Sequence, residues 1–182
     1  MGALSFSKNR RDVLPEEIDG CEIDADFRVV LQAIRIFNSR DYELYDDALF
    51  YFYVDARPED AYNKMVAFIL GGEEPEPSGD PPRMDFEFDA DEIYADFLNF
   101  YGVDLLTARM HWYKFRALLG GILAREGALA SKMQTRFRKT DGLKGQELLD
   151  AQRAKERVQI PVQLTAQEIE EAERFASEWG EL

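Results

Sequence analysis

The sequence predicts a mostly α protein: a compact helical domain with a small amino-terminal β-hairpin and a carboxyl-terminal amphipathic helix. Two observations lead to this class. Apolar residues recur at three- and four-residue steps in segment after segment, which is the spacing of one helix face. One short stretch instead places two apolar arms around an Asp-Gly pair, which is typical of a hairpin turn. With 182 residues, 46% of them hydrophobic, the chain can form one core.

The hairpin is expected over residues 13–23, with Asp19 and Gly20 at its turn. The helices that follow are each indicated by a capping residue, an apolar face or a terminating glycine. Asp24 or Asp26 can cap the first of them, and Asp104 can cap the fifth. Gly120 and the glycine after it are expected to weaken or end that fifth helix. The expected helices cover residues 27–37, 41–54, 58–70, 89–101, 104–119, 128–138 and 145–158, and a last one begins at Thr165.

Two segments determine the expected domain organisation. Residues 73–83 read EEPEPSGDPPR and predict an exposed acidic loop, because proline and glycine at this density prevent regular structure. The chain is therefore expected to form a single helical domain over residues 1–160 and a helical appendage over residues 161–182. A capping box, Thr165-Ala-Gln-Glu168, begins the helix of the appendage.

The apolar face of the last helix is the candidate partner-binding surface. Ile169, Phe175 and Trp179 lie on one side of it. An isolated helix of this length is marginal in water, so this face must dock on the body of the protein or on another chain. We expect deletion of residues 163–182 to weaken self-assembly or partner binding while the body stays folded.

Charge excludes several classes of function. The formal net charge is −14, which disfavours contact with nucleic-acid backbones and anionic membranes. No apolar run approaches the roughly 18 residues that span a bilayer, and the amino terminus lacks the apolar region of a secretory signal. We therefore expect no membrane association, no direct nucleic-acid binding and a cytoplasmic location. The charge is uneven, since residues 109–158 carry a net charge of +7.

Candidates for chemistry are few. A single cysteine, Cys21, excludes an internal disulfide, and a single histidine, His111, excludes the common zinc sites. His111 could serve as a general base or metal ligand, but we expect a packed helix histidine. Acids between Asp85 and Asp96 could bind a divalent cation, although helix-start acids explain most of them. No glycine-rich phosphate loop occurs. We expect no catalytic residue, metal or cofactor, and hence a protein that is not an enzyme.

Residues 84–122 carry four consecutive motifs: an acidic DFEFD start, an IYADF helix, a YGVDL corner and HWYKFRALL. This segment resembles a family of small proteins of long-tailed bacteriophages and prophages, and the resemblance extends over residues 13–140. Tyr113 stands where the family carries a second tryptophan. The principal matching residues, which we expect to be structural, are Asp85, Phe86, Asp89, Ile93, Tyr94, Phe97, Tyr101, Gly102, Asp104, His111, Trp112, Lys114 and Phe115.

The resemblance implies a function without catalysis. Members of the family are encoded just upstream of the tape measure protein, the position held by tail assembly chaperones. It therefore implies a chaperone that binds the tape measure protein in the host bacterial cytoplasm until tail tube protein replaces it. Two alternatives remain: a structural component of the virion tail or connector, and an acidic DNA mimic that inhibits a host protein. A homo-oligomer is compatible with each.

Overall fold

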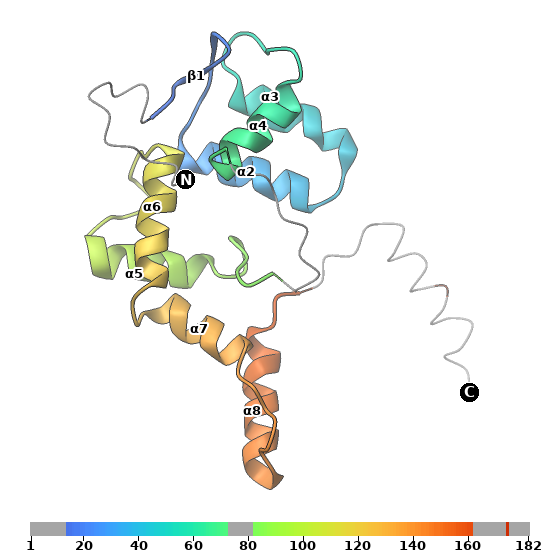
Figure 1. The fold of residues 1–182 in the computed structure, drawn as a ribbon, viewed down its shortest axis with the longest axis vertical. Helices are drawn as coiled ribbons and strands as arrows, with labels where there is room; N and C mark the ends of the chain where they lie inside the picture. The colour runs from blue at the N-terminus through green and yellow to red at the C-terminus, as the bar shows by residue number, and fades with distance from the viewer. Residues whose placement is uncertain (1–13, 73–81, 162–173, 175–182) are drawn as a thin grey trace.

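The computed structural model describes residues 14–72, 82–161 and Arg174, and Figure 1 shows its course. Its described part is a helical protein with one small hairpin, so the predicted fold class is confirmed. Residues 73–81 of the predicted loop, and the apolar residues of the predicted last helix, lie outside the described residues. The elements are β1 (Glu17–Ile18), β2 (Cys21–Glu22), α2 (Phe27–Asn38), the 3-10 helix η1 (Tyr42–Leu44), α3 (Tyr45–Phe52), α4 (Ala61–Leu70), α5 (Ala90–Tyr101), α6 (Trp112–Leu123), α7 (Ala128–Arg136) and α8 (Gly145–Val158).

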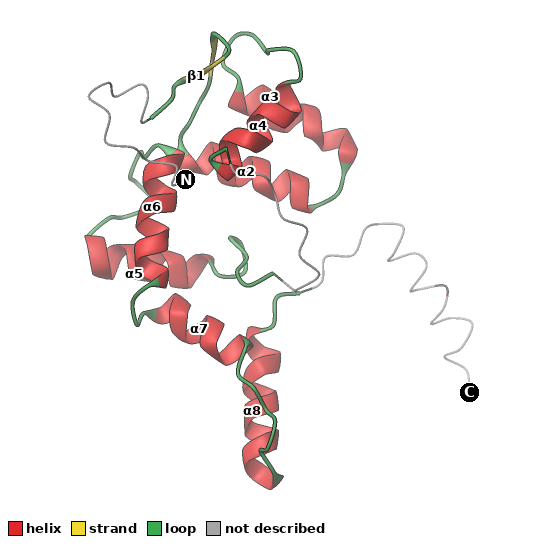
Figure 2. Ribbon diagram, viewed as in Figure 1, coloured by secondary structure: helices red, strands yellow, loops and turns green. Residues whose placement is uncertain are grey.

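The helices form two groups joined by α6. Helices α2, α3 and α4 pack together beneath the hairpin, whereas α5, α7 and α8 lie at the other end (Figures 1 and 2). Helix α6 contacts α2 in the first group and both α5 and α7 in the second. Helix α8 projects from this second end, and Ala151 is its one fully buried residue. None of the described helices has the length and apolar character needed to span a membrane.

The core is centred on a stack of three aromatic rings. The ring of Phe115 in α6 lies between those of Phe27 in α2 and Phe97 in α5, at centroid distances of 4.8 and 5.1 Å. Both pairs are within 9° of parallel. Trp112 adds a fourth ring 5.7 Å from Phe115. Because the stack takes one ring from each of three helices, it joins the two groups into one core.

The hairpin forms where the sequence predicts it. Ile18 and Cys21 are antiparallel partners, and Asp19 and Gly20 take the positive φ angles of 50° and 76° that this tight turn needs. The segment after β2 continues into the body, where the backbone N–H of Asp24 donates to the carbonyl of Phe52. This pairing holds a hairpin that is too short to be stable alone.

The prediction of a helix over residues 104–119 is wrong for the first half of this range. The carboxylate of Asp104 accepts a hydrogen bond from the N–H of Leu106 and closes a single turn, but the chain then becomes extended. Residues 110–112 pair with residues 25–27, through bonds from Phe27 N–H to the carbonyl of Met110 and from Trp112 N–H to the carbonyl of Ala25. This long-range pairing requires extended backbone, so α6 begins only at Trp112.

Three further boundaries differ from prediction. Helix α6 continues through its two glycines to Leu123. Helix α4 begins at Ala61 rather than at Pro58, because Asp60 adopts a left-handed conformation with φ of 59°. The helix predicted over 41–54 divides into η1 and α3, which ends at Phe52 because the extended Tyr53 pairs with Ile23. Asp26, not Asp24, caps α2, with its carboxylate accepting from the N–H of Arg28.

Candidate functional site

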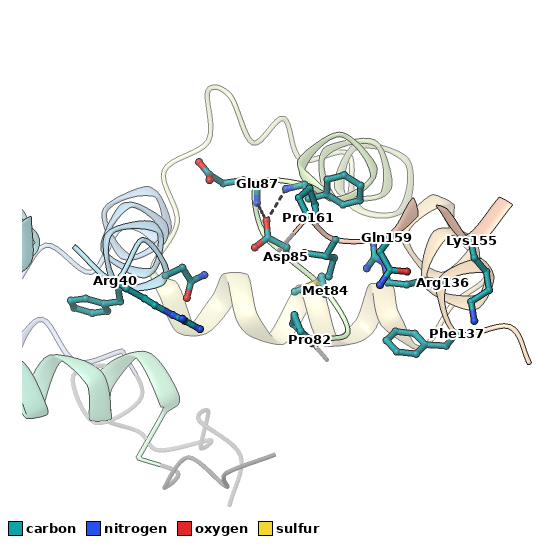
Figure 3. Close-up of a pocket in the computed structure, with 14 residues that line it drawn as sticks. Arg40, Pro82, Met84, Asp85, Glu87, Arg136, Phe137, Lys155, Gln159 and Pro161 are labelled. Carbon is teal, nitrogen blue, oxygen red and sulfur yellow. Dashed lines mark hydrogen bonds between the residues drawn. The ribbon is translucent and has the colours of Figure 1, made fainter. Parts of the chain in front are cut away.

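An open groove of about 900 Å³ lies where four segments of the described part meet (Figure 3). These segments are the carboxyl end of α2, the stretch 82–88 before α5, the end of α7 and the residues that follow α8. Figure 3 shows Arg40 on one side, Phe137 and Lys155 on the other, and Met84 between them. Its apolar lining consists of Phe37, Pro82, Met84, Phe88, Phe137, Ile160 and Pro161.

Arg136, the last residue of α7, holds the groove together. Its side chain is buried, with 4% exposed. The guanidinium donates through Nη1 and Nη2 to both carboxylate oxygens of Asp89, at 3.1 and 2.7 Å. It also donates to the carbonyl of Arg83 at 2.7 Å and to that of Val158 at 2.6 Å. One side chain therefore fixes the stretch before α5 and the end of α8 against α7.

Asp89 is the fully buried partner of this arginine. Its carboxylate also accepts from Lys132 Nζ at 3.1 Å and from the backbone N–H of Asp85 at 3.0 Å. Burial by itself raises the pKa of the Asp89 carboxyl, but the hydrogen bonds from Arg136, Asp85 and Lys132 outweigh burial, so its pKa lies below the usual range. The carboxylate is thus held ionised as a structural anion with its hydrogen-bonding capacity used.

Lys132 extends the network to the surface. Its Nζ donates to Glu92 Oε2 at 2.7 Å and to the carbonyl of Phe88 at 2.8 Å. Burial lowers the pKa of Lys132, but the bonds to Glu92 and Asp89 more than compensate and raise it above the ordinary lysine value. In the described residues no buried polar side-chain atom lacks a hydrogen-bond partner. The network therefore supports the walls of the groove.

The other charged residues of the groove differ in their partners. Glu87 is paired with Arg35 at 2.9 Å, and the carboxylate of Asp85 accepts from the backbone N–H groups of Glu87 and Phe88. Lys155, by contrast, has no carboxylate partner among the residues described. The groove thus offers an apolar surface with unneutralised positive charge at its α8 side.

The family-motif residues lie mainly in the core rather than in the groove. Phe97, Trp112 and Phe115 are buried, and so are Ile93 and Asp89. Phe86 lies against the rings of Trp112 and Phe115, and Tyr94 packs at the edge of the same cluster. Of the thirteen, Asp85 alone lines the groove, while Asp89 supports it from behind.

The other motif residues fix turns and helix ends. Tyr101 donates its hydroxyl to the carbonyl of Leu118 at 2.9 Å, and Gly102 ends α5 with φ of 64°. Asp104 closes the next turn. Lys114 is exposed on α6. These positions shape the corner between α5 and α6.

His111 is the N-cap of α6 and not a residue within the helix. Its Nδ1 accepts from the backbone N–H of Tyr113 at 3.0 Å, and its Nε2 lies 3.0 Å from the carbonyl of Pro15. Because a carbonyl only accepts, this geometry fits a neutral ring with the proton on Nε2. Both nitrogens are thereby engaged with backbone groups, one at a helix start and one near the hairpin.

The remaining sequence-based candidates are dispersed or outside the described residues. Asp85, Glu87 and Asp89 do not alternate along an extended strand, because residues 86–89 form a turn that sends Asp89 inward and Glu87 outward. The described residues contain no group of three or more potential ligands that could hold a metal ion. Ile169, Phe175 and Trp179 lie outside the described residues.

Sequence reasoning missed the groove and its arginine. Arg136 looked like an ordinary base on a helix poor in apolar residues, and its partner Asp89 lies 47 residues away. The sequence held no signal for this pair, because Asp89 has the pattern of an ordinary helix-start acid. Only the structure shows that its carboxylate makes no capping bond to α5 and instead accepts from Arg136.

Together these features define a small helical protein whose motif residues lie mainly in the core and whose described part has an open, largely apolar groove. Residues 11–160 match the family model described as Bacteriophage Gp15 protein. The chain therefore belongs to the Bacteriophage Gp15 protein family, which supports a phage-related function. No curated protein and no solved structure was found that matches it.

Proposed function

We propose that this protein is a non-enzymatic tail assembly chaperone that binds the phage tape measure protein in the host cytoplasm during tail formation. The observation that supports this most directly is the open groove, in which apolar side chains from four segments face solvent beside Lys155. A groove of this kind fits one apolar face of a helix, and a tape measure protein exposes such faces before the tail tube covers them.

The chemistry of the groove agrees with binding rather than catalysis. Its buried acid, Asp89, is saturated by hydrogen bonds from Arg136, Lys132 and Asp85 and has none left for a substrate. The strong net charge of −14 adds the solubility that a carrier of an apolar partner needs. Phe137, whose exposed fraction is 44%, is the groove residue best placed to contact a partner.

Co-expression with the tape measure protein of the same phage tests this function. We expect the tape measure protein to become soluble only with this chain, in a complex with several copies per tape measure molecule, measured by pull-down and by size exclusion with light scattering. Phe137→Ala should lower recovery of the complex by about five- to thirty-fold, the usual effect of truncating an interface anchor. Leu106→Ala is the matched control, because Leu106 is 75% exposed and lies outside the groove.

Two results would contradict the proposal. If the tape measure protein stays insoluble and no complex forms, the chaperone function fails for this chain. If the protein is found in mature phage particles, it is a structural component of the tail or connector, since a chaperone leaves before assembly ends.

A further inference from the structure

The residues that follow α8 form one wall of the groove. Gln159, Ile160 and Pro161 line it, and residues 162–182 continue directly from its edge. A helix from Thr165 to Trp179 would be about 22 Å long. Residues 162–164 provide up to about 10 Å of extended chain to turn such a helix back. Residues 162–182 are therefore tethered to the groove that they could occupy.

The chemistry of this segment complements that of the groove. Ile169, Phe175 and Trp179 fall on one helical face, matching an apolar lining that includes Phe37, Met84 and Phe137. Residues 165–182 carry six acids and one base. Of the two acids in the groove, Glu87 is paired with Arg35, and Asp85 accepts hydrogen bonds from backbone N–H groups. Lys155 of α8 provides a positive charge at one side of the groove (Figure 3).

We propose that the groove binds the chain's own residues 162–182, so that the segment covers the apolar lining until a partner helix displaces it. Binding within one chain is favoured over binding to a second copy, because a short tether gives an effective concentration of roughly millimolar. The docking itself does not depend on the proposed function. Only the identity of the competing partner rests on the proposed function. The partner that competes best is then an acidic amphipathic helix with aromatic anchors.

Trp179 allows a direct test in the full-length protein without any partner. The chain has two tryptophans, and Trp112 is only 2% exposed. The spectrum of the wild type minus that of Trp179→Phe isolates the emission of Trp179. We expect short-wavelength emission and weak quenching by acrylamide, both independent of protein concentration, as docking in cis requires.

Groove variants then locate the docking site. Phe137→Asp and Lys155→Glu should shift the Trp179 emission to longer wavelength and raise its acrylamide quenching constant at least two-fold. Leu106→Asp and Lys114→Glu are matched controls on exposed positions outside the groove and should leave both unchanged. Circular dichroism verifies that each variant keeps its helices, and Lys155→Glu carries the test if Phe137→Asp does not fold.

Three outcomes would overturn the inference: Trp179 fully exposed in the wild type, protection that the groove variants do not alter, or protection that appears only at high protein concentration. The last would assign the contact to a second copy. Because the measurement contains no tape measure protein, its failure leaves the proposed function untouched. If both proposals hold, a chain ending at residue 161 should bind the tape measure protein more tightly. This is the opposite of the weakening expected from the sequence if residues 163–182 are themselves the partner-binding surface.

Discussion

The carboxylate of Asp96 in α5 occupies the space that a side chain at Gly127 would need. Its oxygens accept hydrogen bonds from the N–H groups of Ala128 and Leu129, at 2.9 and 3.0 Å, and so cap α7 from a different helix. A Cβ at position 127 would lie 2.5 Å from Asp96 Oδ2 and 2.8 Å from its Cγ. The N-cap position of α7 is thus glycine because its cap comes from elsewhere.

Removing this carboxylate should destabilise the protein more than removing an ordinary helix acid. Asp96→Ala leaves two backbone N–H groups without a partner, one of them buried, and should lower the free energy of unfolding by about 2–3 kcal/mol in urea denaturation. Asp91→Ala, on the exposed first turn of the same helix, is the control and should cost less than about 1 kcal/mol. Similar losses for the two variants would contradict capping by Asp96.

Gly127→Ala should cost about 1–3 kcal/mol because the new methyl group overlaps the Asp96 carboxylate. Most of that cost should vanish when Asp96 is already alanine, since the overlapping atoms are then absent. A double-mutant cycle measures this coupling. Additive effects would show that Gly127 is needed for another reason.

The two adjacent glycines of α6 should respond oppositely to alanine. Gly120 faces open space, so Gly120→Ala should raise the free energy of unfolding by about 0.5–1 kcal/mol. At Gly121 a methyl group would overlap the hydroxyl oxygen of Tyr101, so Gly121→Ala should be destabilising. Tyr101→Phe should relieve part of that loss by removing the oxygen. Equal responses of the two glycines in thermal melts would refute this packing.

The buried pair of Asp89 and Arg136 predicts a specific acid dependence. Folding lowers the pKa of the Asp89 carboxyl. The stabilisation that the ionised carboxylate provides is therefore complete above the pKa of the unfolded chain, about 3.9, and is lost as the pH falls through the lower pKa of the folded protein. Asp89→Asn should cost about 3–5 kcal/mol at pH 7, because it leaves the buried Arg136 without its anion. The free energy of unfolding of the Asp89→Asn variant should also fall less steeply than that of the wild type below about pH 4.

Glu87→Gln is the matched control for Asp89→Asn. The ion pair of Glu87 and Arg35 is largely exposed, with 52% and 61% of the two side chains accessible. Glu87→Gln should therefore lower the free energy of unfolding by at most about 1 kcal/mol. Unfolding by urea between pH 2 and pH 7 measures both effects. An acid dependence unchanged by Asp89→Asn would assign the acid sensitivity to other carboxylates.

His111 should behave as a cap and not as a catalyst. His111→Ala should lower stability by about 1–2 kcal/mol, because it removes the acceptor for the N–H of Tyr113 and the contact with Pro15. His111→Asn should retain part of the lost stability, since asparagine is a good N-cap residue. Lys114→Ala, on the exposed face of the same helix, should change stability by less than about 0.5 kcal/mol. Thermal denaturation that ranks asparagine below alanine would contradict the capping role.

Local patterns predicted those elements whose causes are local. The apolar spacing from Phe27 onward gave α2, and Asp19-Gly20 gave the hairpin turn, because each depends on neighbours within a few residues. The start of α6 could not be predicted in this way. Residues 110–112 are extended only because they pair with residues 25–27, and no local signal records a partner so far away.

The candidate site was less predictable than the fold for the same reason. The groove needs Phe37, Met84, Phe137 and Ile160 to converge from four segments, and each looks like an ordinary core residue in its own segment. The groove's arginine, Arg136, gave no sign that it would be buried, since surface helices usually carry such residues exposed. Tertiary packing thus determines the groove and the burial of Arg136, which hydrophobic periodicity along the sequence could not predict.

The position of α6 between the two groups of helices has a consequence for synthesis on the ribosome. Phe27 in α2 stacks on Phe115, so the core of the first group stays incomplete until α6 has been made. At about 5–20 residues per second, the interval between the two residues is roughly 4–18 s. During this interval α3 can pack on α2, but Phe27 lacks the ring of Phe115, so the first group cannot complete its core before α6 leaves the ribosome.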